Sequence, residues 1–296
     1  MSNTQDQKHC RRIAAAIVAV ACLVGGPLLG VFLAGRDLGP YLEFPPATRY
    51  VEHPGFSWGM FVAVLVISVI CCILFYFPRI WVERVPAHRR VHAPAPSAAG
   101  ADTAGERARF RWWGWLGLAL VAVWWPIAWG RPDVLGDVNR YTFTPLWLGL
   151  ILVLDALVYR RKGHSMATRS PLGLLLLFML SAGMWWFFEY LNRFTQNWYY
   201  SATRTHSPAE YFWAATPCFA TVLPAVFEMT ELLGDGGWIQ RRFRGVVSLP
   251  GCRRWVQAAS VLFGTPGLTA AAWMPSIFFP CLWLCPLFIV VPLVAW

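Results

Sequence analysis

Residues 171–191 have the sequence PLGLLLLFMLSAGMWWFFEYL, an apolar run of the length that a helix needs to cross a bilayer. Similar runs recur along the whole chain of 296 residues, in which 57% of the residues are hydrophobic and only 14% are charged. Soluble domains carry about 25% charged residues. The sequence therefore predicts an all-α, polytopic integral membrane protein, since a helix satisfies its own backbone polar groups within the bilayer.

We expect about eight transmembrane helices, and seven is the alternative because mainly Pro275 separates the last two apolar runs. The first run follows a short basic stretch, but no clear cleavage site follows it before Arg36, so we expect a retained helix rather than a removed signal peptide. The expected spans are 13–34, 56–77, 113–130, 144–159, 171–191, 209–233, 256–274 and 276–296.

The basic residues predict the orientation of the chain in a bacterial cytoplasmic membrane. With the N-terminus in the cytoplasm, the outer loops hold few of the 25 Lys and Arg residues, namely Arg36, Arg49, Arg131, Arg140, Arg193 and Arg204. The net charge of +10 is therefore an orientation signal, and we expect no nucleic-acid partner. The expected partners are membrane lipids, a second copy of the chain or another membrane protein.

A stretch rich in Pro, Ala and Gly divides the chain at 86–108, where we expect a flexible cytoplasmic linker. Before it, residues 1–85 predict a two-helix membrane section whose outer loop, 42–58, forms a cap. After it, residues 109–296 predict a six-helix membrane body. None of the eight cysteines lies in an outer loop, which argues against a disulfide framework.

Carboxylates inside the expected spans are the candidates for chemistry, because an ionisable group is costly in a bilayer. An outer group comprises Glu189, Asn192 one helical turn later, and Glu210 at the start of the next helix; the connecting loop supplies Trp198 and Tyr200. If these groups converge, one carboxyl can stay protonated as an acid while the aromatic faces stabilise a cation. Helix contacts and loop anchoring are the alternative role.

A second polar cluster is expected near the inner helix ends, where Asp155, Glu228 and Glu231 lie. Glu228 and Glu231 are three residues apart and so share one side of their helix. We favour ion pairing of this cluster with the basic inner loops, for example with Arg160, Arg161, Arg241 or Arg242.

Several motifs of soluble enzymes are missing from the sequence. There is no G-x-G-x-x-G after a strand, no Walker A motif, no H-E-x-x-H and no G-x-S-x-G. Cys281 and Cys285 are one turn apart, but no His or carboxylate near them in sequence completes a metal site. We therefore expect no metal and no cofactor.

The segment EYLNRFTQNWYY at 189–200, followed by PAEYFWAATP at 208–217, resembles the lycopene cyclase domain of multi-pass carotenoid enzymes. That family carries an acidic residue, a Trp nine positions later, an aromatic two beyond it, and then a Pro-x-Glu-Glu block. The residues that keep this pattern are Glu189, Trp198, Tyr200, Pro208, Glu210, Phe212 and Pro217.

Three positions depart from the family pattern. Glu189 stands where the family usually has Asp, Gln196 replaces an expected glycine, and Tyr211 replaces the second Glu of the block. The resemblance extends loosely over 142–233. The whole chain also resembles a group of bacterial multi-pass membrane proteins that share its LEFPP, PLWLG and FATVLPAVFE sequences.

The resemblance implies acid-catalysed cyclisation or isomerisation of a polyprenoid, without a redox cofactor. Glu210 would donate a proton to a terminal alkene, and Glu189 would tune it or accept a proton. Trp198 and Tyr200 would shield the carbocation, and the remaining substrate contacts would come from Asn192 and Phe212. The alternatives are a transporter or flippase of a lipid-like solute, for which midspan prolines are suited, and a non-enzymatic membrane scaffold.

Overall fold

The computed structural model describes residues 13–46, 109–200, 206–234 and 254–295, together with Cys10 and eight residues between 58 and 70. In these residues every regular element is a helix, and no strand is present. The predicted all-α class is therefore confirmed for the described part of the chain. The expected linker 86–108 and most of the cap loop 42–58 lie outside it.

Five described helices are long and apolar enough to cross a membrane: Ile13–Leu33, Trp112–Gly130, Phe143–Lys162, Pro171–Thr195 and Pro208–Gly234. A sixth crossing results if Pro275–Cys285 and Leu287–Leu293, which meet at an angle of 53°, form one broken span. The expected span 256–274 corresponds to α12 (Arg254–Trp273), which is helical but is not among the five. The expected span 56–77 lies mostly outside the described residues.

The chain forms two compact units, each built from separate segments. The first unit comprises Met1–Glu52, Met184–Trp213 and Leu249–Trp296. The second unit comprises His53–Gly183 and Ala214–Ser248. The long helix α8 (Pro171–Thr195) contributes its first part to the second unit and its last part to the first.

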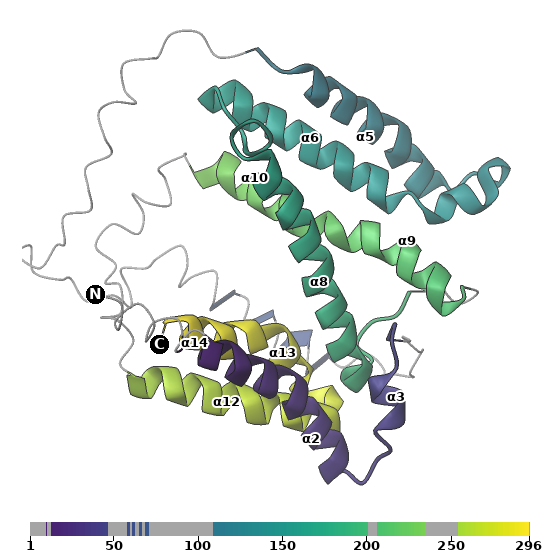
Figure 1. Cartoon of the computed structure of the whole chain (residues 1–296). Coiled ribbons are helices and arrows are strands. Elements are labelled where there is room, and N and C mark those ends of the chain that lie inside the picture. Colours follow the sequence, from purple (N-terminus) through teal and green to yellow (C-terminus); the bar gives the residue numbers. More distant parts are fainter. Residues whose placement is uncertain are drawn as a thin grey trace, which may run out of the picture. The chain divides into compact units, whose positions relative to one another are not determined.

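In the first unit, close packing joins the N-terminal helix to α12 (Figure 1). The N-terminal helix contains a π-helical segment, η1 (Ala21–Gly25), and continues as α2 (Gly26–Leu33). A Cβ atom at Gly30 would clash with the carbonyl oxygen of Thr269 on α12, so only glycine permits this approach. The Thr269 hydroxyl donates a hydrogen bond to the Gly26 carbonyl at 3.0 Å. The other helices of this unit are α3 (Gly39–Leu42), α13 (Pro275–Cys285), η7 (Pro286–Val290) and α14 (Val291–Ala295).

In the second unit, α5 (Trp112–Gly130) and α6 (Phe143–Lys162) run side by side (Figure 1). A Cβ atom at Gly117 would lie 2.6 Å from the carbonyl oxygen of Gly149, so these glycines let the two backbones approach closely. The 3₁₀ segment η5 (Asp133–Arg140) connects the two helices, and the short α7 (Met166–Arg169) follows α6.

Helices α9 (Pro208–Ala220) and α10 (Val222–Gly234) form one candidate span with a break at Thr221. The buried Ser181 hydroxyl from α8 donates to the carbonyl oxygen of Phe219 at 2.6 Å and accepts from the Leu223 N–H at 3.0 Å. Phe219 and Leu223 would pair with each other in an unbroken helix, so Ser181 is inserted into the helical hydrogen-bond ladder.

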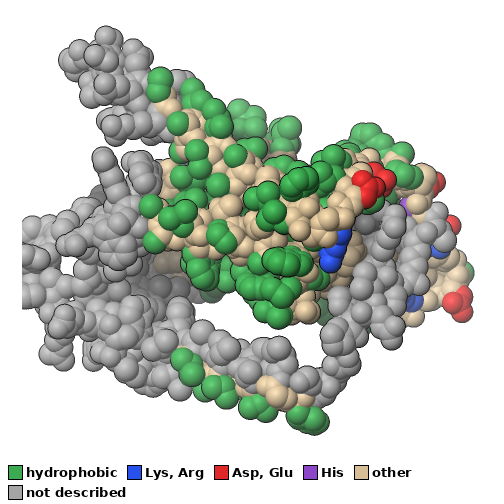
Figure 2. Space-filling view, turned by 90° about the horizontal axis from the view of Figure 1, so that it is seen from below, with side chains coloured by type: hydrophobic (Ala, Val, Ile, Leu, Met, Phe, Trp, Pro, Cys, Tyr) green, Lys and Arg blue, Asp and Glu red, His purple; other side chains and the backbone are tan. Residues whose placement is uncertain are grey.

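Large hydrophobic side chains are exposed on most of the helices. Trp112, Trp129, Leu172, Trp213 and Leu262 are each more than 60% exposed. Figure 2 shows hydrophobic side chains spread over the described surface of one face, with few charged groups among them. Soluble monomers rarely expose apolar surface of this extent, whereas a lipid environment accommodates it.

Candidate functional site

The carboxylate of Glu189 lies buried near the C-terminal end of α8, where three aromatic side chains donate hydrogen bonds to it. Its Oε1 atom accepts from the indole Nε1 of Trp198 at 2.9 Å and from the hydroxyl of Tyr200 at 2.7 Å. Its Oε2 atom accepts from the hydroxyl of Tyr211 at 3.4 Å. The carboxylate is thus fully removed from solvent, with aromatic donors at both oxygens.

Further aromatic rings extend this environment. The Trp185 indole donates to the Tyr200 hydroxyl at 3.4 Å, and the ring of Trp283 from α13 lies 5.0 Å from that of Trp198. We call Trp185, Trp198, Tyr200, Tyr211 and Trp283 the aromatic cluster. All five belong to the first unit, as does Glu189.

Asn192 holds the loop that carries two members of the aromatic cluster. Its Nδ2 donates to the carbonyl oxygen of Trp198 at 2.8 Å. Its Oδ1 accepts from the backbone N–H groups of Asn197 at 2.8 Å and Trp198 at 3.2 Å. Gln196 reverses the chain just after α8 in a left-handed conformation with φ of 49°. The buried amide of Asn192 therefore fixes the position from which Trp198 reaches Glu189.

Tyr200 lies outside the candidate spans, in the loop between α8 and α9. Burial, followed by the negative charge of Glu189, raises the pKa of the Tyr200 phenol above its ordinary value of 10.0. The phenol consequently remains a hydrogen-bond donor to Glu189 throughout the physiological pH range.

Glu210 occupies different surroundings from Glu189. Its Oε2 accepts from the backbone N–H of Ser207 at 2.7 Å, and the Ser207 Oγ accepts from the Glu210 N–H at 3.3 Å. This reciprocal pair is a capping box at the start of α9, and the Glu210 side chain is exposed. Among the described contacts, none joins Glu210 to Glu189. The structure therefore brings together Glu189, Trp198 and Tyr200, and leaves Glu210 at the helix start.

Phe212 packs in a neighbouring aromatic group rather than against Glu189. Its ring stacks on Trp186 with a centroid distance of 5.3 Å and meets Phe44 edge-on at 5.9 Å. Trp186 in turn meets the Tyr211 ring edge-on at 5.7 Å. Tyr211 thus links this group to the aromatic cluster.

Tyr211 and Trp185 belong to the site, although neither was predicted to lie there from the sequence. Tyr211 is buried with Ala215 and Phe219, which follow it at intervals of four residues on one face of α9. This spacing was a signal for an inward-facing position. Trp185 precedes Glu189 by one helical turn and therefore lies on the same face of α8.

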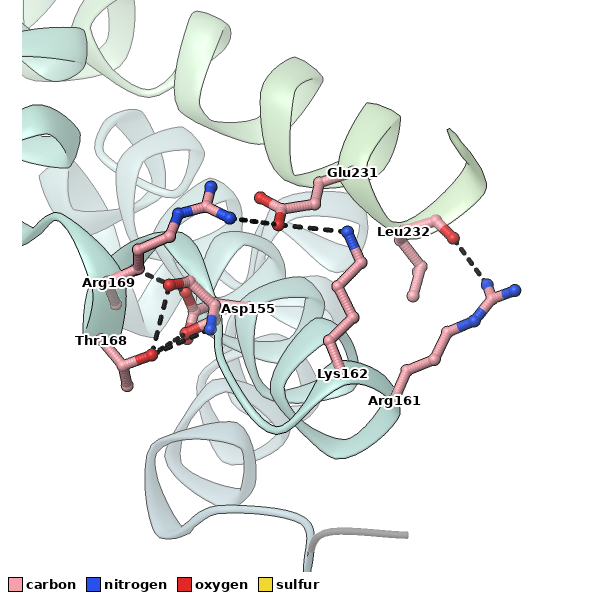
Figure 3. A network of polar contacts seen from close by, with 9 residues as sticks. Asp155, Arg161, Lys162, Thr168, Arg169, Glu231 and Leu232 are labelled. Atoms are coloured by element: carbon pink, nitrogen blue, oxygen red, sulfur yellow. Dashed lines mark hydrogen bonds and ion pairs between the residues drawn. The ribbon is translucent and has the colours of Figure 1, made fainter. Parts of the chain in front are cut away.

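Asp155, a member of the second polar cluster, lies in the second unit with hydrogen-bond partners of its own (Figure 3). The buried Asp155 carboxylate accepts hydrogen bonds from Trp113 Nε1 at 2.9 Å, Ser165 Oγ at 2.9 Å and the Ala167 backbone N–H at 3.0 Å. These donors lie on α5, on the connection after α6 and on α7. Asp155 therefore ties three segments of the second unit together.

Ion pairs of the expected kind are present at Glu231, with partners other than the arginines named from the sequence. Glu231 pairs with Lys162 at 3.2 Å and with Arg169 at 3.5 Å (Figure 3). Arg161 instead donates to the carbonyl oxygen of Leu232 at 2.8 Å. Glu228 is fully buried on the same helix, and Arg241 and Arg242 lie outside the described residues.

In the part of the chain that the structure describes, no three His, Cys, Asp or Glu residues are grouped in a way that suits a metal ion. Comparison of the chain with protein-family models, with curated proteins and with solved structures found no match.

Proposed function

We propose that the protein is a membrane enzyme that acts on a polyprenoid by acid-catalysed cyclisation or isomerisation, with Glu189 as the proton donor. One observation carries this proposal: a carboxyl group without solvent exposure lies among the rings of Trp198, Tyr200 and Tyr211. A water-excluded acid beside aromatic faces suits a reaction that passes through a carbocation.

The chemistry needs only this one carboxyl group. The protonated form of Glu189 adds its proton to one carbon of an alkene, and the cation develops at the other carbon. Loss of a proton from an adjacent carbon back to the Glu189 carboxylate then restores the acid and leaves an isomer. The three donors stabilise the carboxylate between these two transfers.

The family resemblance implies that Glu210 is the proton donor, but the surroundings of Glu189 suit a proton donor better. The Glu210 carboxylate is exposed and accepts the Ser207 N–H of its own helix start. A carbocation formed beside an exposed carboxylate would meet water, whereas one formed at Glu189 would meet aromatic rings. Glu210 therefore serves as the matched control for Glu189.

The test compares wild type, Glu189→Gln and Glu210→Gln in a host that accumulates lycopene. We expect a new cyclic or isomerised product with wild type and with Glu210→Gln. Loss of a general acid lowers a rate by about 10²–10⁴-fold, so Glu189→Gln should give no detectable product at equal membrane expression. Equal product from Glu189→Gln would refute its role, and no product from well-expressed wild type would reject lycopene as the substrate.

We further propose eight transmembrane helices with the N-terminus in the cytoplasm of a bacterial inner membrane. The uneven distribution of Lys and Arg supports this orientation, and the five described candidate spans support a multi-pass chain. Reporter fusions after each expected span would test it. An outside location for residues 160–170 would contradict it.

Transport of a lipid-like solute is the second candidate function. The break at Thr221, where Ser181 separates the Phe219 carbonyl from the Leu223 N–H, favours it. Broken helices provide solute sites and hinges in many transporters. Movement of a labelled lipid across proteoliposomes, abolished by Ser181→Ala but retained in Glu189→Gln, would favour transport over the enzyme.

A further inference from the structure

Glu228 is a buried carboxyl group in the described part of the second unit that, unlike Asp155, accepts no described hydrogen bond. Its side chain is fully buried on α10, and neither of its carboxylate oxygens has a hydrogen-bond partner among the described residues. An unpaired carboxylate in such a place carries a large desolvation cost. Burial of this kind therefore requires a ligand or a change of charge.

The cations described in this part of the second unit already have other partners. Arg169 lies within electrostatic range of Glu228, but its guanidinium and the Lys162 ammonium both contact Glu231, at 3.5 and 3.2 Å. Arg161 is bound to the backbone carbonyl of Leu232. The charged groups within electrostatic range of Glu228 are Asp155 from α6, Glu231 from its own helix, and Arg169 from α7.

Asp155 offers Glu228 an acceptor rather than a charge partner. A carboxylate has about four lone-pair sites. Asp155 uses three of them for Trp113, Ser165 and Ala167, with one at Oδ1 and two at Oδ2. One acceptor site at Oδ1 remains, and α10, which carries Glu228, packs directly against α6, which carries Asp155, within range of an interaction between the two carboxyl groups.

We propose that Glu228 and Asp155 form a proton-binding site, in which the carboxylic acid of Glu228 donates its proton to the remaining acceptor site of Asp155. A bound proton satisfies Glu228 and removes one of two adjacent negative charges. A metal ion is the less suitable ligand, because the three described carboxyl groups do not form a metal-binding arrangement. This site lies in the second unit and does not depend on the proposed role of Glu189.

A proton held here couples the protonation of Glu228 to the position of α10 relative to the segments that Asp155 joins. Loss of the proton would place two charges side by side, and Asp155 would then repel α10 while still holding Trp113 and Ser165. The site consequently takes up or releases one proton when α10 moves relative to α6. Proton-driven membrane processes require such a group.

Infrared spectroscopy of the purified full-length protein in lipid tests the site directly. A protonated carboxyl group has a C=O stretch that is separate from the bands of a carboxylate. Because a protonated Glu189 would add a band of its own, the comparison is made in Glu189→Gln: we expect the band at neutral pH in Glu189→Gln and in Glu189→Gln with Glu231→Gln, and its loss in Glu189→Gln with Glu228→Gln. Gln keeps an N–H donor for Asp155 and nearly the volume of Glu, so it is the mildest replacement.

Isotope labelling keeps the test independent of the folding of that variant. Incorporation of ¹³C-glutamate into Glu189→Gln should shift the same band, and Asp155→Asn in that background should change its frequency because the acceptor changes. Absence of a protonated-carboxyl band in Glu189→Gln at neutral pH would overturn the proposal. A band that persists at full intensity when Glu228→Gln is added to folded Glu189→Gln, or that does not shift with ¹³C-glutamate, would also overturn it.

Discussion

Replacement of Asn192 by alanine should weaken the hydrogen bond between Trp198 and Glu189 without changing either of these two residues. The Asn192 amide makes three hydrogen bonds, one to the Trp198 carbonyl and two from the backbone N–H groups of Asn197 and Trp198. Each bond contributes about 1 kcal/mol net, so the substitution should lower the free energy of unfolding by about 3 kcal/mol. The loss should come with increased mobility of the loop that carries Trp198.

A double-mutant cycle with Trp198→Phe separates this positioning effect from a general loss of stability. Trp198→Phe removes the Nε1 donor to Glu189, at a cost of about 1–2 kcal/mol, together with part of the ring that packs against Trp283. If Asn192 positions that donor, the two effects overlap and the double variant loses about 1 kcal/mol less than their sum. Denaturant titration in detergent, followed by tryptophan fluorescence, measures all four free energies.

Asn139→Ala is the matched control for this cycle. The Asn139 amide makes one described hydrogen bond, to the Pro132 carbonyl at 3.0 Å, and it lies in the second unit. Its effect should be about 1 kcal/mol and should add to that of Trp198→Phe. Additive behaviour of Asn192→Ala as well, or a loss below about 1 kcal/mol, would refute the argument that Asn192 positions Trp198.

Two further predictions concern the helix break and the Tyr200 phenol. Ser181→Ala leaves the Phe219 carbonyl and the Leu223 N–H without their hydrogen-bond partner, so we expect the free energy of unfolding to fall by about 1–3 kcal/mol and hydrogen exchange at Leu223 to become faster. The control is Thr230→Ala, which removes a hydroxyl bonded within its own helix and should change neither quantity. An unchanged Leu223 exchange rate would argue against the inserted hydroxyl. Because the pKa of Tyr200 is raised in the folded state, its contribution to stability is complete below pH of about 10 and decreases as the pH rises further. Alkaline unfolding should therefore depend less on pH in Tyr200→Phe than in wild type, and parallel curves would contradict the assignment.

Apolar runs in the sequence located several helices within a few residues, but their ends depend on contacts that sequence does not show. The expected span 144–159 continues to Lys162, where basic side chains favour a helix C-terminus and Gly163 ends the helix with φ of 78°. The expected span 171–191 continues to Thr195 because Asn192 and Arg193 are buried in the first unit. A hydropathy pattern assigns these polar residues to solvent.

The candidate site was predictable where its residues are close in sequence. The spacing of Glu189, Trp198 and Tyr200 indicated convergence, and the structure brings the three together. Trp283 is distant in sequence, and only the packing of α13 places its ring beside Trp198. The exposed position of Glu210 was indicated by the pattern Ser-x-x-Glu at 207–210, which is the signature of a capping box.

The surroundings of three glutamates assign them different tasks. Glu210 keeps its charge in water and stabilises the start of a helix. Glu189 is buried with three donors, so its anion is tolerated within an aromatic environment and it can give up and recover a proton there. Glu228 is buried without a donor among the described residues, so its neutral form is the one that fits. Gln preserves the shape of Glu but not the acid, and it also serves in a capping box. Glu210→Gln should therefore leave both product formation and the Glu228 band unchanged, Glu189→Gln should abolish product formation, and Glu228→Gln should remove its own protonated-carboxyl band. The same effect from all three variants would show instead that these carboxylates act through a common structural role.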